Sequence, residues 1–212
     1  MALIPSVIGI SPGDHGCGRT LTWLLQGAID GGLKAVILRE PHLSRPAYVE
    51  LARRVSPLLG SGLILHSSHE DAIDVAEASG WGLHLAKGAD IPSARKRVQG
   101  LLGVSCHSTE DLHTAADSGA DYATISPVFK PLSKPSDLRP PLEPEGLAEA
   151  ITGIDLPVFA LGGITNETAS SILHTDVHGV ASMGFVFPTD ADADLCATNA
   201  ASLCMIMKRR AG

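Results

Sequence analysis

The sequence has few aromatic residues, no excess of basic charge and no long apolar run. Aromatic residues make up 4% and apolar residues 44% of the 212 positions, so the core must be built mainly from Leu, Ile, Val and Ala. The net charge is −7 and the basic runs are short, so we expect neither a nucleic-acid partner nor binding to an anionic membrane. A membrane-spanning helix needs about 20 apolar residues. Runs such as Val158 to Leu161 end far sooner, and no membrane span is predicted.

Paired cysteines and a secretory leader are also lacking. Cys17, Cys106, Cys196 and Cys204 are scattered, and no set of His, Cys, Asp or Glu shows compact ligand spacing, so no metal site is predicted. Residues Met1 to Ile10 lack the basic start and long apolar stretch of a signal peptide. We therefore expect the protein in the reducing cytoplasm.

Short runs rich in Val, Ile and Leu alternate with segments of helical periodicity. This alternation is typical of strand-helix units around a parallel sheet, and eight units predict one (β/α)₈ TIM barrel spanning residues 1–212. A doubly wound open sheet is the alternative, although Gly13, Gly16 and Gly18 match a dinucleotide-binding turn only loosely. The predicted strands are Val7–Ser11, Lys34–Arg39, Gly62–Ser67, Gly82–Ala86, Leu102–His107, Tyr122–Ser126, Val158–Gly162 and Gly179–Met183.

Helix starts and apolar stripes agree with this alternation. Ser44, Ser108 and Thr165 stand where helices are expected to begin, with hydroxyls suited to accept a bond from the first turn. Residues 127–144 form one long irregular connection, which predicts either a functional lid or a disordered segment. Two stripes with i, i+3, i+4, i+7 spacing are expected to face the barrel: Leu21, Leu24, Leu25 and Ala28, and Leu147, Ala150, Ile151 and Ile154.

In a barrel of this kind, catalytic groups lie where strands end. Arg39 ends an otherwise apolar strand, where an unpaired buried charge would be costly, so it needs an anionic partner. Glu40, Glu77 and an anionic substrate are the candidates.

The fifth predicted strand carries two sets of side chains on opposite faces. Gly103, Ser105 and His107 form the more polar set, which we expect to point inward. A histidine at this place exchanges protons near neutral pH because its ordinary pKa is about 6.5. Catalysis and support of the next helix are both open for His107. Cys106 belongs to the outward set and is expected to fill the core.

Glycines follow the seventh and eighth strands. Gly162 and Gly163 permit close approach of backbone N–H groups to a ligand, and a helix expected to start near Asn166 adds a positive dipole end. With Met183 and Gly184 after the eighth strand, this is where TIM barrels commonly bind phosphate. A simple chain reversal is the alternative role of the glycine pair.

Several of these segments together resemble the thiamine phosphate synthase and TenI superfamily. The likeness covers most of the chain and is strongest from Leu102 to Gly184. It rests on the segments Leu38-Arg39-Glu40, Gly103-Val104-Ser105-Cys106-His107-Ser108, Gly119-Ala120-Asp121-Tyr122, Ser126-Pro127-Val128-Phe129 with Ser133-Lys134, and Ala160-Leu161-Gly162-Gly163-Ile164.

The resemblance implies a barrel that handles a thiazole phosphate in thiamine biosynthesis. The synthase branch joins a pyrimidine pyrophosphate to thiazole phosphate with Mg²⁺, whereas the TenI branch moves a proton to aromatise a thiazole carboxylate phosphate. This sequence has His66 and Ser67 where the synthase pattern has Asn-Asp, and Lys87 where it has Gln. We therefore expect a TenI-like tautomerase without a cofactor, with the Mg²⁺-dependent synthase and a non-catalytic phosphate-binding barrel as alternatives.

The resemblance also implies roles for individual residues. His107 is expected to move the proton, and Arg39 with Lys134 to hold the carboxylate of a small phosphorylated thiazole. The oligomeric state stays open, with a homodimer through outer helices as the expectation. The remaining expected contacts are Glu40, Ser105 and Ser133 for substrate, and Gly162, Gly163, Met183 and Gly184 for phosphate.

Overall fold

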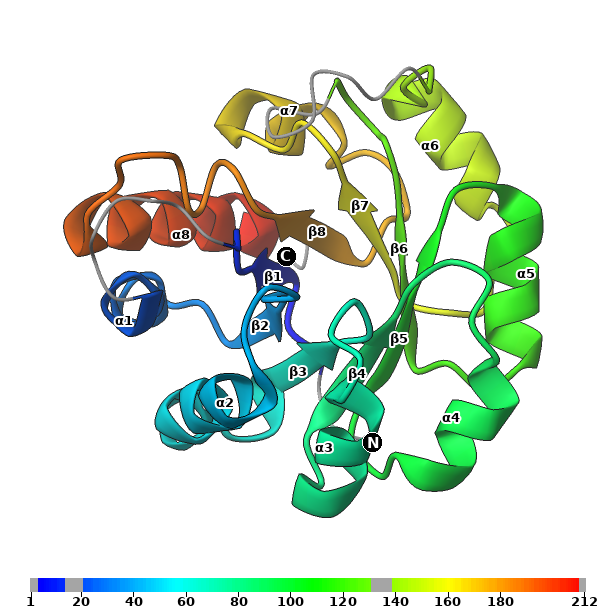
Figure 1. The fold of residues 1–212 in the computed structure, drawn as a ribbon. Helices are drawn as coiled ribbons and strands as arrows, with labels where there is room; N and C mark the ends of the chain where they lie inside the picture. The colour runs from blue at the N-terminus through cyan, green and yellow to red at the C-terminus, as the bar shows by residue number, and fades with distance from the viewer. Residues whose placement is uncertain (1–3, 14–20, 131–138, 210–212) are drawn as a thin grey trace.

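Short strands and helices alternate along the chain, as the apolar runs predict (Figure 1). The structure is a computed structural model that describes residues 4–13, 21–130 and 139–209. The strands are β1 (Val7–Ile10), β2 (Ala35–Leu38), β3 (Leu63–His66), β4 (Gly82–Leu85), β5 (Leu102–Cys106), β6 (Tyr122–Ile125), β7 (Val158–Leu161) and β8 (Gly179–Ser182).

The eight strands form a closed parallel barrel. Each strand pairs in parallel with the next one along the chain, and β8 pairs with β1 through Val7 and Val180. Because all strands run the same way, their carboxyl ends open at one end of the barrel. The (β/α)₈ prediction is confirmed, and the open-sheet alternative is wrong.

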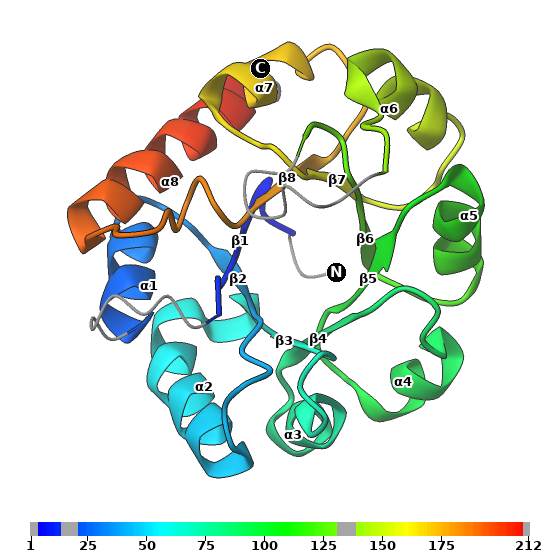
Figure 2. The ribbon, with the colours of Figure 1, turned by 45° about the horizontal axis from the view of Figure 1, so that its top comes forward.

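The helices surround the ring of strands, as the view along the barrel shows (Figure 2). Helices α1 and α8 pack closely at Gly27. A Cβ on this residue would lie 2.2 Å from the carbonyl oxygen of Ala193. The helices are α1 (Leu21–Asp30), α2 (Arg45–Leu59), α3 (Ala72–Ser79), α4 (Ile91–Arg97), α5 (Thr109–Asp117), α6 (Glu143–Ile151), α7 (Asn166–Ser171) and α8 (Ala193–Lys208); a 3₁₀ turn, Gly60–Gly62, follows α2.

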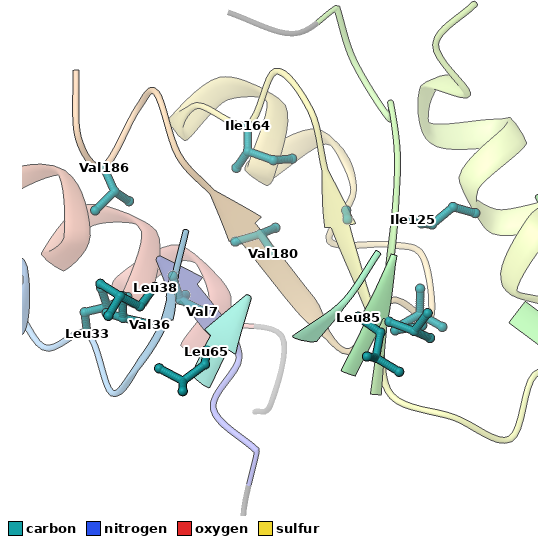
Figure 3. Packing of buried hydrophobic residues seen from close by; sticks show 14 of the residues in the cluster. Val7, Leu33, Val36, Leu38, Leu65, Leu85, Ile125, Ile164, Val180 and Val186 are labelled. Atoms are coloured by element: carbon teal, nitrogen blue, oxygen red, sulfur yellow. The ribbon is translucent and has the colours of Figure 1, made fainter. Parts of the chain in front are cut away.

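Two apolar layers stabilise the barrel. The larger layer lies between strands and helices and includes Val36, Leu38 and Val180 (Figure 3). The smaller layer fills the inside of the ring and includes Tyr122 and Phe159. Alternate residues of each strand enter alternate layers, which is the period of two expected for strands covered on both faces.

The predicted strands are all present, and each ends one residue earlier than expected. The Leu24, Leu25 and Ala28 stripe is buried, as predicted. Ser108 and Thr165 cap α5 and α7 through their hydroxyls, but Ser44 makes no side-chain cap bond to α2. No helix of the described chain is long and apolar enough to span a membrane.

Candidate functional site

A cavity of about 390 Å³ opens at the carboxyl ends of the strands. Strand alternation explains its wall: inward positions continue past the strand ends, so β2 delivers Arg39, β5 delivers Ser105 and His107, and β6 delivers Ser126. The described lining residues are Ile10, Ile37, Arg39, His66, Ser68, His84, Ala86, Lys87, Ser105, His107, Ser126, Pro127, Arg139, Leu161, Gly162 and Met183.

The cavity brings together part of the predicted site. Arg39, Ser105, His107, Gly162 and Met183 contribute to its wall. The other predicted positions divide into two groups: Glu40, Gly163 and Gly184 adjoin lining residues in the chain without lining the cavity, and Ser133 and Lys134 lie outside the described residues.

Several side chains that line the cavity were not among the predicted site residues. His66 and His84 lie on the inward faces of β3 and β4. The alternation of side chains along these strands was therefore sufficient to predict that both face the cavity. Lys87 and Arg139 lie on loops, where no periodicity indicates direction.

His107 is held in one tautomer at the cavity wall. Its Nδ1 lies 2.8 Å from the carbonyl oxygen of Ser126. A carbonyl only accepts, so Nδ1 carries the proton and Nε2 keeps its lone pair. Burial lowers the pKa of His107, the bond to Ser126 opposes that effect, and the positive charges of Arg139 and Lys87 lower the pKa further. The imidazole is therefore a neutral base at neutral pH.

Asp111 organises the chain around His107. Its Oδ2 lies 2.8 Å from Nζ of Lys87 and accepts the backbone N–H of His107 at 2.8 Å. Although burial acts to raise the pKa of Asp111, these bonds lower it overall. The carboxylate therefore keeps Lys87 at the cavity rim and fixes the backbone that carries His107.

The floor of the cavity contains a buried imidazole. Nδ1 of His84 lies 3.0 Å from the hydroxyl of Tyr122, and Nε2 lies 3.0 Å from the hydroxyl of Ser105. Burial lowers the pKa of His84 well below 6.5, and the nearby His66 acts in the same direction. A neutral ring with one donor and one acceptor orients the Ser105 hydroxyl, which lines the cavity.

Neither acidic partner considered for Arg39 forms an ion pair with it. Glu77 pairs with Arg97 instead, and Oε1 of Glu40 accepts the N–H of Gly13 at 3.1 Å. Burial raises the pKa of Glu40. Since Arg39 forms no ion pair with a described carboxylate, an anionic ligand is the partner that suits its position in the wall.

The Gly162-Gly163 turn packs against the segment that follows β6. Both residues have positive φ, 99° and 62°. A Cβ on Gly163 would lie 2.5 Å from the carbonyl oxygen of Lys130, and Gly162 accepts the N–H of Phe129 at 3.0 Å. Close packing therefore accounts for both glycines, and Gly162 also forms part of the cavity wall.

The described residues offer no carboxylate set for Mg²⁺ in this wall. They contain no group of three or more His, Cys, Asp or Glu side chains arranged to hold a metal ion. Mg²⁺ prefers oxygen ligands, commonly carboxylates. Asp90, three residues after Lys87 in the chain, accepts bonds from the N–H and hydroxyl of Ser93 at the start of α4.

Comparisons with solved structures support the fold. Thiamine phosphate pyrophosphorylase from Pyrococcus furiosus superposes with a TM-score of 0.79 at 23% identity, covering 98% of this chain and 97% of that chain. At this level of identity the likeness shows a shared barrel.

Sequence comparisons identify the family. A family sequence model, TMP-TENI, described as thiamine monophosphate synthase, matches residues 8–186. Thiamine-phosphate synthase from Roseiflexus castenholzii is 34% identical over 190 residues, 84% of this chain and 81% of the relative. The enzyme of the same name from Chloroflexus aurantiacus is 31% identical over 201 residues, 92% of this chain and 90% of the relative. These names favour the synthase alternative and give no specific support to the expected TenI branch. The chain belongs to the TMP-TENI family of thiamine biosynthesis.

Proposed function

We propose that this protein is a thiamine-phosphate synthase, which joins a pyrimidine pyrophosphate to thiazole phosphate. The names of its relatives support this choice over the tautomerase. The structural observation that carries it is one cavity whose wall combines cationic side chains with the turn after β7. Such a cavity suits a pair of substrates that each carry phosphate groups.

The two anionic groups take different parts of the wall in this proposal. Gly162 and Met183, with the adjoining Gly163 and Gly184, receive the thiazole phosphate through backbone N–H groups. Arg39 receives the pyrophosphate, and Lys134 is proposed to assist it. Holding both substrates in one cavity makes the coupling effectively intramolecular, which lowers its entropic cost.

The polar side chains on the cavity floor are proposed to orient the organic rings. Ser105 presents a hydroxyl fixed by His84, and Ser133 is a further proposed substrate contact. Glu40 acts indirectly in this scheme, because its bond to Gly13 anchors the loop after β1. The charge on the departing group is met by the cationic side chains, since no carboxylate lines the described wall.

A coupling assay tests the proposed function. Purified protein is incubated with the pyrimidine pyrophosphate and thiazole phosphate, and thiamine phosphate is measured with and without Mg²⁺. We expect product that depends on both substrates. Arg39→Met is expected to lower kcat/KM by about 100-fold, because an anion contact is lost in the transition state. Absence of product under both conditions would overturn the proposal.

A TenI-like tautomerase is the second candidate, and the geometry of His107 favours it. The ring is neutral, with its proton fixed on Nδ1 by Ser126, and a base in this state can accept a proton from a substrate carbon. Arg39 and Lys134 would then hold the thiazole carboxylate. This chemistry needs no metal ion.

The His107→Gln variant separates the two reactions. We expect it to lower aromatisation of the thiazole carboxylate phosphate by about 100-fold or more, because the proton acceptor is gone. Coupling and phosphate binding should change far less. Unchanged aromatisation in the variant eliminates the tautomerase, whereas tight ligand binding with neither reaction identifies the non-catalytic barrel.

A further inference from the structure

The described wall of the cavity is cationic and contains no carboxylate. Its sixteen described residues include Arg39, Lys87 and Arg139, together with histidines, but no Asp or Glu. In a partly enclosed space such an arrangement attracts anions, since the electrostatic interaction is screened less than in bulk water. The wall is thus suited to several negative charges on one ligand.

Three acidic residues that follow lining residues closely in the chain have other partners. Asp90 bonds to Ser93 at the start of α4, Glu40 is buried and bonded to Gly13, and Asp111 is paired with Lys87. These contacts direct each of the three carboxylates to the protein itself. A divalent cation would find cationic neighbours in the described wall and no carboxylate ligand.

Lys87 is one of the three cationic side chains in the described wall. Its ion pair with Asp111 holds the ammonium group at the end of β4, although the side chain remains 50% exposed. The same carboxylate fixes the backbone N–H of His107. Arg139 lines the same cavity, and its charge and that of Lys87 both act on His107. The cations Lys87, paired with Asp111, and Arg139 therefore line the cavity from the loops after β4 and β6, in addition to Arg39 from β2.

We propose that Arg39, Lys87 and Arg139 bind the pyrophosphate group directly and take over the charge neutralisation that Mg²⁺ provides in the synthase reaction. This inference rests on the proposed coupling reaction. In that reaction a bond forms between the thiazole ring nitrogen and the carbon that carried pyrophosphate. The carbon–oxygen bond to pyrophosphate breaks, and its electron pair leaves on the pyrophosphate oxygen. The three side chains stabilise that developing charge, as fixed cations do in other phosphoryl sites.

Binding of inorganic pyrophosphate tests the inference without requiring turnover. Titration calorimetry is performed on the intact protein in EDTA and again with excess Mg²⁺. We expect binding in EDTA and equal or weaker binding with Mg²⁺, because the metal ion sequesters free pyrophosphate. Binding only when Mg²⁺ is present would overturn the proposal.

Matched variants assign the binding to these side chains. Lys87→Met and Arg139→Met are each expected to weaken pyrophosphate binding in EDTA by about 10-fold, the loss of one charge-assisted contact. Lys96→Met, on the exposed surface of α4, should leave it unchanged. Normal affinity in both cavity variants would contradict the proposal, and circular dichroism verifies that each variant is folded.

The coupling assay separates this inference from the proposed function. Pyrophosphate binding in EDTA without thiamine phosphate formation retains the anion site and removes the synthase assignment. Product formation that requires Mg²⁺, with no binding in EDTA, retains the synthase and removes the metal-independent site.

Discussion

Nδ1 of His107 lies 2.8 Å from the carbonyl oxygen of Ser126, so the loop after β6 determines which nitrogen of the imidazole carries the proton. The two residues directly follow the neighbouring strands β5 and β6, which pair in register. The pairing of β5 with β6 therefore determines which nitrogen of His107 carries the proton, because a shift of this register would remove the acceptor from His107.

The charges around His107 predict the direction of its titration. Burial lowers the pKa of His107, and the positive charges of Arg139 and Lys87 lower it further against the opposing bond to Ser126. We expect its NMR titration midpoint below 6.5, so the neutral form extends to lower pH than in a free histidine. Lys87→Met removes a positive charge and leaves Asp111 unpaired, and both changes should raise the midpoint. A midpoint above 6.5 in the wild-type protein, or a downward shift in the variant, contradicts this account.

The sequence indicated the barrel and the inward face of β5 because both depend on local periodicity. Each apolar run is short and bounded by polar or glycine residues, and alternation alone placed Ser105 and His107 inside. The strand ends were each placed one residue too far, since the pattern of side chains does not reveal where ladder hydrogen bonds stop.

Contacts between distant residues could not be predicted in this way. Lys87, on the loop after β4, is held at the cavity by an ion pair with Asp111 on α5. Glu77 was a candidate partner for Arg39 but pairs with Arg97 on the neighbouring α4. Such pairings depend on how helices pack around the barrel, and one sequence contains no local signal for them.

The glycine turn after β7 should tolerate a methyl group poorly. Gly163→Ala places a Cβ 2.5 Å from the carbonyl oxygen of Lys130 at a φ of 62°. Strain at positive φ costs about 1 to 2 kcal/mol, and overpacking adds about 1 to 3 kcal/mol. Gly153→Ala is the matched control, because its φ is 75° and nothing lies within 4 Å of the added Cβ.

Urea unfolding measures this difference. We expect the free energy of unfolding to fall by about 1 kcal/mol in Gly153→Ala through strain alone and by clearly more in Gly163→Ala. Equal losses in the two variants would show that the segment after β6 moves aside without cost.

The buried cysteines should resist alkylation in the folded protein. Burial raises the pKa of Cys106 to about 12 and that of Cys196 to about 11. Only the thiolate reacts, so labelling by iodoacetamide at pH 7.5 should be very slow at both positions. Peptide mass spectrometry reports each site separately, and urea-unfolded protein provides the positive control. Rapid labelling of Cys106 in the folded state would contradict its place in the outer core layer.

Two serines that look equivalent in the sequence should differ in their contribution to stability. The Ser108 hydroxyl accepts the N–H of Asp111 at 3.2 Å at the start of α5, whereas Ser44 makes no side-chain cap bond to α2. Ser108→Ala should therefore reduce the free energy of unfolding by about 1 kcal/mol, the usual loss of an N-cap bond. Ser44→Ala should change it by less than about 0.5 kcal/mol, as at an ordinary surface site. Urea titrations of both variants decide the matter, and a larger loss at Ser44 would mean that its hydroxyl caps α2 in solution.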